Sequence, residues 1–408
     1  MRRVIACVLA GCGGSGPAPE PIEIGFLAPL TGDIAAFGRD LTDASNLALE
    51  EINNAGGVLE NREIRLKVYD TGTSATGASI GFTALLNQQV PVILGPTASS
   101  EAVGIREQVK AGTTLTISQS ATSPELSTLD FGGYFFRLAP SDAVQSVVLA
   151  QQITMKAPPN LCIVHRDDAY GNGLTEALRP RVTTNIVEAK FDPALADLSH
   201  VLDVCDSLAP MPGNAILFIT LVADGAQLMD AAASRGWSPT KHQVFLTDGT
   251  KNHDLITILS TPSFIEGAIG TAPTGPSPDS PDGVVLRDFR TRFRTRYARD
   301  ADVYSEYAYD AMYVAAMGIE IAKTADDRPA IKSAMAKVSM GTQLAATGDW
   351  SVIRDAIRAD GQVDYRGASG EVTFDLATGD IIGPFFISVW TISNGNVVDT
   401  AIVKIDSL

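Results

Sequence analysis

The chain has 408 residues, of which 45% are hydrophobic and 19% are charged, a composition typical of a globular protein. Its length exceeds what one hydrophobic core usually organises and therefore predicts two lobes. A formal net charge of −16 argues against a nucleic-acid partner, because phosphate binding needs clustered Lys and Arg.

The N-terminus has the features of an export signal. Two arginines precede a short apolar run that ends in Leu9-Ala10-Gly11-Cys12, a small-residue cleavage site. We therefore expect a signal peptide over residues 1–11 and a flexible Gly- and Pro-rich tether over residues 12–21. The longest apolar run elsewhere, Ala215 to Ala223, is too short to span a bilayer. The sequence thus predicts an exported protein that is at most anchored to a membrane.

From residue 22 onward, the chain alternates predicted strands and helices. The first elements are a strand Ile22–Ala28, a helix Phe37–Asn54, a strand Ile64–Asp70 and a helix Ser74–Gln88. Two further buried strands then each lead into a polar loop, over residues 90–100 and 114–124. This alternation favours a parallel sheet covered by helices on both faces.

The alternation restarts after an extended segment, Phe135–Pro140. Ser141 and Asp142 are placed to cap a new helix that runs to Lys156. Strands are then expected at 161–165, 186–191, 215–220 and 243–247, and helices at 174–182, 195–208 and 225–235. Such a restart indicates a second doubly wound lobe.

The last part of the chain breaks the alternation. Helices at 286–298, 305–323 and 329–338 have no strands between them, so we expect them to cover the first sheet. Strands at 372–376 and 385–392, with a tight turn at Asn394-Gly395, follow them. We predict an α/β fold of two doubly wound parallel-sheet lobes, residues 22–140 with 270–345 and residues 141–269 with 346–408. Several crossovers would then form a hinge beside a cleft.

Two hydroxyl-rich loops follow adjacent buried strands. Ser99 and Ser100 end the first loop, just before a helical stretch from Glu101 to Lys110, and the second loop carries Ser120, Ala121 and Thr122. Ligands of open α/β sheets bind at the carboxyl ends of the strands, and free N–H groups at a helix start attract anions. The loops therefore predict a site for a small carboxylate, although a Ser or Thr after a strand is often only a helix cap.

Two of the four cysteines lie in the expected fold. Cys162 falls in a predicted strand and Cys205 near the end of a predicted helix. Export to an oxidising compartment permits a disulfide between them, and two buried free thiols are an equally good interpretation.

The sequence lacks the motifs of the common enzyme classes. It contains no G-x-S-x-G elbow, no Walker A sequence and no C-x-x-C or H-E-x-x-H metal motif. Gly11, Gly13 and Gly16 match a dinucleotide fingerprint, but no strand precedes them. We expect a binding protein that is not an enzyme and that holds neither metal nor cofactor.

Seven short motifs lie at 28–32, 51–58, 95–100, 120–126, 136–142, 170–173 and 309–311. In this order and spacing, they resemble the leucine/isoleucine/valine-binding proteins of ABC importers, which have the periplasmic type I solute-binding fold. Leu9-Ala10-Gly11-Cys12 likewise resembles the bacterial lipobox, so the resemblance implies lipidation of Cys12.

The resemblance also implies roles for particular residues. Ser99 and Thr122 would donate hydrogen bonds to a ligand α-carboxylate, and the backbone from Ser120 through Ala121 would serve the head group. Asp248 would pair with the α-ammonium, and Tyr170 would close over the ligand from the second lobe. A zwitterion taken out of water needs such partners at both ends.

The side-chain pocket departs from the family pattern. Phe37 stands where an aliphatic-amino-acid binder often has Tyr, Leu221 and Val222 stand where an aromatic is common, and Asp248 replaces a longer Glu. A branched-chain amino acid is therefore one expectation, and other amino acids, amides and aromatic acids are alternatives.

The expected function is a lipid-anchored receptor of the periplasm or cell envelope. It would close on an amino acid as a monomer and dock to an ABC permease and ATPase complex. A binding protein that reports its ligand to a separate membrane receptor is the alternative.

Overall fold

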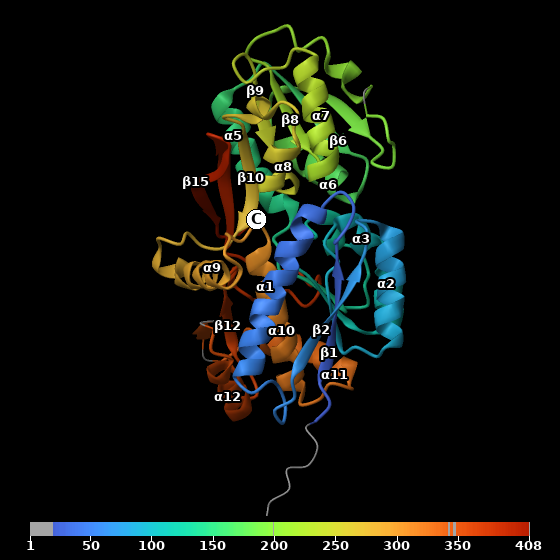
Figure 1. The fold of residues 1–408 in the computed structure, drawn as a ribbon, viewed down its shortest axis with the longest axis vertical. Helices are drawn as coiled ribbons and strands as arrows, with labels where there is room; N and C mark the ends of the chain where they lie inside the picture. The colour runs from blue at the N-terminus through green and yellow to red at the C-terminus, as the bar shows by residue number, and fades with distance from the viewer. Residues whose placement is uncertain (1–18, 199, 342, 346–347, 408) are drawn as a thin grey trace, which may run out of the picture.

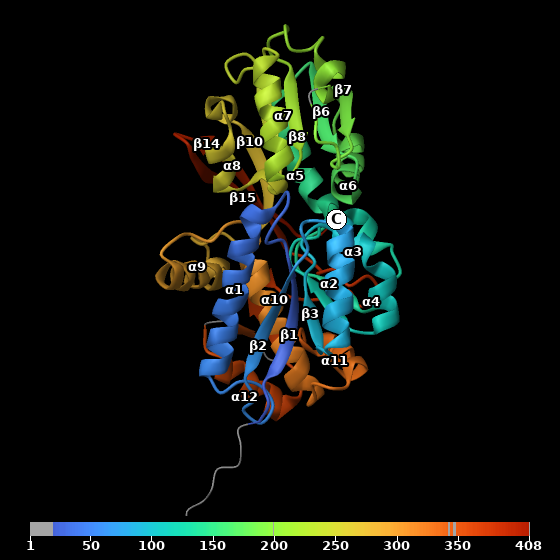
Figure 2. The ribbon, with the colours of Figure 1, turned by 45° about the vertical axis from the view of Figure 1, so that its right-hand side comes forward.

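The structure is a computed structural model that describes residues 19–198, 200–341, 343–345 and 348–407. The expected signal peptide and Cys12 lie outside these residues. Two α/β lobes follow one another along the longest axis of the molecule (Figures 1 and 2). Within the described residues, no helix is both long and apolar enough to cross a membrane.

Lobe 1 contains a parallel sheet in the order β2-β1-β3-β4-β5. Its strands are β1 (Ile22–Ala28), β2 (Ile64–Asp70), β3 (Val92–Leu94), β4 (Leu115–Ser118) and β5 (Phe135–Arg137). Because β3, β4 and β5 are buried throughout, they consist almost entirely of apolar and hydroxyl side chains. The predicted parallel sheet is confirmed.

Helices cover both faces of this sheet. The helices of the lobe are α1 (Ala35–Asn54), α2 (Ala75–Asn87), α3 (Ser99–Gly104), α4 (Arg106–Gly112), α9 (Val284–Tyr297), α10 (Ser305–Ala322), α11 (Arg328–Ala334) and α12 (Trp350–Asp360). Helix α10 packs against α1 and the sheet, and it is buried from Ser305 to Ile321. The helices that follow one another without intervening strands thus cover the first sheet, as expected.

Lobe 2 contains a mixed sheet in the order β15-β14-β10-β9-β8-β6-β7. Its strands are β6 (Asn160–Arg166), β7 (Asn185–Phe191), β8 (Ala215–Ile219), β9 (Gln243–Leu246), β10 (Ile269–Thr274), β14 (Phe385–Ser393) and β15 (Asn396–Ile405). Strands β6 to β10 pair with one another in parallel, whereas β14 pairs antiparallel with both of its neighbours, β10 and β15. The β14–β15 hairpin turns at Asn394 and Gly395, both at positive φ, as that dipeptide predicts.

The helices of lobe 2 are α5 (Asp142–Lys156), α6 (Ala169–Leu178), α7 (Val222–Ser234) and α8 (His253–Ile258). Helix α6 begins earlier than predicted, where the Asp168 side chain accepts the Gly171 N–H as a cap. It also ends earlier, because Pro180 stands two residues after its last residue, Leu178. The expected helix 195–208 is only a 3-10 turn, Val201–Cys205.

The structure corrects two lobe boundaries. Strand β10 pairs with β9 and therefore belongs to lobe 2, so the boundary lies after Thr274. Residues 350–371 belong to lobe 1: α12 packs on α1 and α10, and the indole of Trp350 donates to the Gly57 carbonyl at 2.8 Å. A small sheet of β11 (Gln343–Ala345), β12 (Asp364–Gly367) and β13 (Gly370–Glu371) lies with them. The prediction that lobe 2 takes up 346–408 was wrong for residues 350–371, because sequence order does not show which core buries an apolar helix face.

The described chain passes between the lobes at three places, residues 138–141, 275–283 and 372–384. These three crossovers form the predicted hinge. The expected strand 372–376 falls in the third crossover, where its only bridge joins Phe374 to Ile381.

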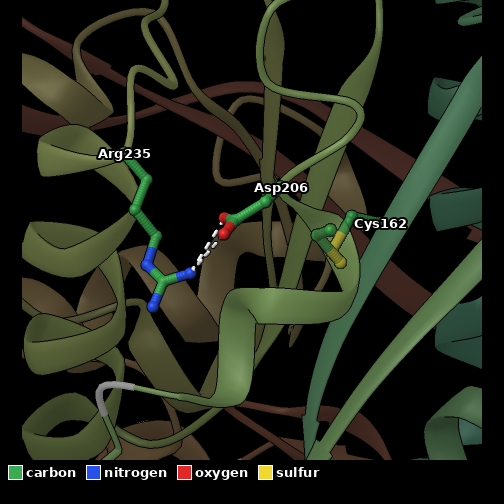
Figure 3. The surroundings of a disulfide bond; sticks show 4 residues. Cys162, Asp206 and Arg235 are labelled. Carbon is green, nitrogen blue, oxygen red and sulfur yellow. Dashed lines mark hydrogen bonds and ion pairs between the residues drawn. A yellow bond between two sulfur atoms is a disulfide. The ribbon is translucent and has the colours of Figure 1, made fainter.

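A disulfide joins Cys162 in β6 to Cys205 in the 3-10 turn (Figure 3). Next to it, Arg235, which directly follows α7, donates two hydrogen bonds to the Asp206 carboxylate, at 2.9 and 2.8 Å (Figure 3). The disulfide attaches an irregular segment to the sheet of lobe 2, and the ion pair attaches the same segment to the end of α7.

Candidate functional site

A cavity of about 40 Å³ lies between the lobes. The lining residues of lobe 1 are Ile34, Phe37, Thr97, Ala98, Ser99, Ser100, Ser120, Thr122 and Tyr304, and those of lobe 2 are Asp168, Tyr170, Leu221, Asp248 and Gly249. A bound water needs roughly 10–15 Å³ of such cavity volume, so the cavity has space for a few waters. Of the predicted site residues, Ala121 alone does not line it, because its side chain packs into the lobe 1 core.

A larger opening of about 630 Å³ also lies between the lobes, beside α1, α9 and β15. Most of its charged side chains already pair with one another, as Arg299 does with Asp40 and Lys251 with Asp399. The smaller cavity differs because Asp248, unlike Asp168, forms no ion pair with a basic side chain of the described residues.

Ser99 is positioned as a hydrogen-bond donor to the cavity. It is the first residue of α3, and its Oγ accepts the N–H groups of Thr122 at 3.2 Å and Ser123 at 3.1 Å. Because those contacts use the oxygen lone pairs, the hydroxyl proton stays available to a ligand. Ser99 thereby also joins the two predicted loops.

Ser120 has its hydroxyl committed within the protein. Its Oγ donates to the Thr97 carbonyl at 2.9 Å, which ties the second loop to the first. Thr122 is oriented through its backbone, since its carbonyl accepts the Asp142 N–H at 2.8 Å. Both residues line the cavity.

Glu101 binds the backbone just before α3. The Glu101 carboxylate accepts the N–H groups of Thr97 at 3.2 Å and Ala98 at 2.9 Å, which precede the first helical residue, Ser99. Burial raises the pKa of Glu101 to about 7. Helix α3 ends at Gly104 and a second helix follows, so the expected helix 101–110 is broken.

Asp248, directly after β9, lies at the centre of the site. Its Oδ1 accepts Gln145 Nε2 at 2.7 Å and the Tyr170 hydroxyl at 2.9 Å, and its Oδ2 accepts the Tyr304 hydroxyl at 2.7 Å. Only 3% of the residue is exposed, and burial raises its pKa despite these bonds. No basic side chain of the described residues forms an ion pair with it, so the position favours a positively charged ligand group.

Asp142 is a second buried carboxylate, which the sequence indicated only as part of a helix cap. Burial, and then the charge of Asp248, raise its pKa well above the usual range. The Thr122 hydroxyl and the Arg137 guanidinium lower it only in part. Two neighbouring carboxylates without an ion-pair partner destabilise each other's charged form, and a cation bound between the lobes would relieve this.

Two tyrosines approach Asp248 from opposite lobes. Tyr170 of α6 also contacts the Thr247 hydroxyl at 2.9 Å, within lobe 2. Tyr304 begins α10 in lobe 1 at a φ of 70°, a left-handed conformation that costs a non-glycine residue roughly 1–2 kcal/mol. Because Tyr304 lies in lobe 1 and Asp248 in lobe 2, the hydrogen bond between them joins the lobes.

Gln145 and Tyr304 were missed by sequence reasoning. The one available signal was that Tyr304 stands five residues before the 309–311 motif.

The apolar wall of the cavity consists of Ile34, Phe37 and Leu221, all buried. Phe37 has no hydroxyl, so it offers only hydrophobic contact and ring faces to a ligand. This wall suits an apolar side chain and offers no partner to a charged one.

An ion-pair network joins the two lobes next to the cavity. Arg166, at the end of β6, pairs with Asp33 of lobe 1 at 3.0 Å and with Asp168 at 2.7 Å, and it also contacts Asp224. Burial raises the pKa of Asp224 to about 6. Because Asp33 and Arg166 belong to different lobes, their bond forms only when the lobes approach each other.

Two hinged α/β lobes around a small cavity with polar and apolar walls define a solute-binding protein by architecture. The chain matches the periplasmic binding protein family over residues 21–393 and belongs to that family. The predicted family and fold class are confirmed.

Three similar proteins illustrate the family. The chemotactic signal transduction system substrate-binding protein BasB of Halobacterium salinarum is 26% identical over 376 residues, 90% of this chain and 86% of that protein. Leu/Ile/Val-binding protein homolog 3 of Brucella melitensis is 25% identical over 350 residues, 84% and 92% of the two chains. The crystal structure of the leucine binding protein LivK of Thermotoga maritima superposes with a TM-score of 0.78 at 22% identity, covering 95% and 100%.

Proposed function

We propose that this protein captures an apolar amino acid, branched-chain or similar, between its lobes and delivers it to an ABC permease in the cell envelope. The proposal rests on donors and an acceptor that line one cavity: Ser99 and Thr122 carry hydroxyls on its lobe 1 side, and the buried Asp248 carries a carboxylate on its lobe 2 side. A zwitterion satisfies both sides at once. The relative named for Leu/Ile/Val binding supports the same ligand class.

In this proposal each part of the ligand has its own partner. The α-carboxylate accepts from Ser99 and Thr122, the α-ammonium replaces hydroxyl donors on Asp248, and the side chain packs on Phe37 and Leu221. Residues of both lobes line the cavity, so in this proposal the lobes part to admit the amino acid. Closure afterwards is favoured because Arg166 forms its interlobe bond to Asp33 only in the closed arrangement.

A thermal-shift screen tests the ligand class. The twenty amino acids, small amides and hydroxybenzoates are each added to the purified protein. A ligand at about 100 times its Kd stabilises the native state by about 2.7 kcal/mol, so we expect apolar amino acids to raise the Tm by several degrees. The Ser99→Ala variant should need more ligand for the same shift. A shift with hydroxybenzoates or amides alone would reject an amino acid as the cargo.

Signal reporting is the second candidate, favoured by the likeness to a chemotactic substrate-binding protein. Permease and ATPase genes beside the gene for this chain would support transport, and a neighbouring receptor gene would support sensing. We also propose that the ligand leaves chemically unchanged, which mass spectrometry of ligand recovered after long incubation will check.

We propose further that Cys12 carries a lipid anchor. Cells supplied with labelled palmitate should incorporate label into the wild-type protein, whereas the Cys12→Ser variant should remain unlabelled and be recovered in the soluble fraction. An unlabelled wild type would contradict the anchor without affecting ligand binding.

A further inference from the structure

A fully buried arginine connects the hinge to the second hydroxyl-bearing loop. Arg137 ends β5, directly before the first crossover, and its side chain is inaccessible to solvent. Its Nη1 donates to the carbonyls of Ala121 at 3.3 Å and Ser123 at 2.8 Å. Its Nε donates to the Asp380 carboxylate at 2.7 Å, in the third crossover. One planar guanidinium thus holds the second hydroxyl-bearing loop and the third crossover together.

These bonds determine which way the loop faces. Arg137 holds the carbonyls of Ala121 and Ser123, and the Asp142 N–H holds the carbonyl of Thr122 between them. On the opposite side, the N–H groups of Thr122 and Ser123 donate to Ser99. Because both sides of the backbone are fixed, the Thr122 side chain has one orientation relative to the cavity.

The third crossover is held against β5 at the same point. The Gly379 carbonyl accepts the Arg137 N–H at 2.9 Å, and the Asp380 Oδ2 accepts the Ser127 hydroxyl at 2.7 Å. Gly379 has a φ of 79°, and a Cβ there would lie 2.0 Å from the Phe135 carbonyl oxygen. Only glycine fits this approach. Asp380 itself does not line the ligand cavity.

We propose that Arg137 and Asp380 are positioning residues for ligand binding, which orient Thr122 through the hinge without touching the ligand. This inference rests on the proposed function, since it assigns the orientation of a loop in that site. Rotation of the crossovers when the lobes open then moves the residues that hold the loop. A charge-assisted bond is about twice as strong as a neutral one, so neutralising Asp380 loosens the loop while the packing stays.

The test uses calorimetry with L-leucine, or with the amino acid that gives the largest thermal shift. We expect Asp380→Asn and Arg137→Lys to bind at least tenfold more weakly than the wild type, and Asp380→Glu, which keeps the carboxylate, to bind within about threefold of it. Glu320→Gln is the matched control. It removes the charge of another carboxylate that pairs with an arginine: Glu320 pairs with Arg358 at the far end of α10, about 24 Å beyond Tyr304. It should lower stability and leave affinity unchanged.

Hydrogen exchange adds a measurement that a purely structural role would not change. In the ligand-free Asp380→Asn variant, the amides of Thr122 and Ser123 should exchange at least tenfold faster, while those of β1 keep their protection. A folded Asp380→Asn protein with wild-type affinity overturns the positioning role and leaves the proposed function standing. If the wild type binds no amino acid at all, both proposals fail.

Discussion

The Asp248→Asn variant is expected to lose amino-acid binding while remaining folded. Removing one partner of a buried charge pair costs about 2–5 kcal/mol of binding free energy, so the Kd should rise by roughly 30-fold to several thousand-fold. Asn retains the shape and can still bond to Gln145, Tyr170 and Tyr304. Calorimetry measures the affinity and thermal unfolding measures the stability of the same preparation.

Although its affinity falls, the ligand-free Asp248→Asn variant should be at least as stable as the ligand-free wild type. Burial raises the folded-state pKa of Asp248 above its unfolded value. The folded protein therefore binds this proton more tightly than the unfolded chain, and stability falls as pH rises through both pKa values. At neutral pH, Asn removes that penalty, so its Tm should equal or exceed that of the wild type. A variant that binds normally would exclude Asp248 as the ammonium partner.

Wild-type affinity should also depend on pH through the same carboxylate. An ammonium pairs only with the ionised form, so binding releases the proton and tightens as pH rises through the raised pKa of the ligand-free state. As the pH falls, binding should begin to weaken at a pH above about 3.9, the pKa of an unperturbed Asp side chain. In Asp248→Asn, this pH dependence should be absent.

Removing the Cys162–Cys205 disulfide should produce the largest loss of stability. The bond closes a loop with a sequence separation of 43, for which the chain-entropy relation gives about 4 kcal/mol at 25 °C. The double variant Cys162→Ala/Cys205→Ala should therefore unfold at markedly lower denaturant concentration. Chemical denaturation followed by circular dichroism measures the difference.

Ligand affinity is the control for this prediction. Cys162 lies within β6, away from the carboxyl end of the strand where Arg166 meets Asp33. The folded double variant should thus bind its amino acid as the wild type does. If reduction of the wild type leaves the unfolding midpoint unchanged, the two sulfurs are not bonded in solution.

Much of the fold follows from patterns that are local in the chain. Buried strands such as Val92–Leu94 and Leu115–Ser118 are short apolar runs, and the helices between them end at recognisable turn residues. Ser99, Ser120 and Thr122 could be placed at one edge because parallel strands all end there. The tight turn at Asn394-Gly395 was predictable because that dipeptide adopts positive φ readily.

The contacts around Asp248 could not be predicted in this way. Gln145 lies 103 residues before it and Tyr304 lies 56 residues after it, and neither position carries a local pattern that indicates a ligand. Asp142 appeared only as a helix cap, because burial next to another carboxylate depends on how helix α5 packs. The assignment of α12 to lobe 1 depended in the same way on which core received Trp350.

The amino-acid sequence by itself therefore determined two α/β lobes, a hinge of several crossovers and a hydroxyl-bearing sheet edge, because alternating apolar patterns and turn residues act over a few neighbours. Only the tertiary structure decided which carboxylates are buried without a cation, which tyrosine crosses from lobe 1 to Asp248, and how Arg137 ties the hinge to the loop. Those features arise from desolvation and hydrogen bonding between residues far apart in the chain, and such energies exist only once the lobes have packed.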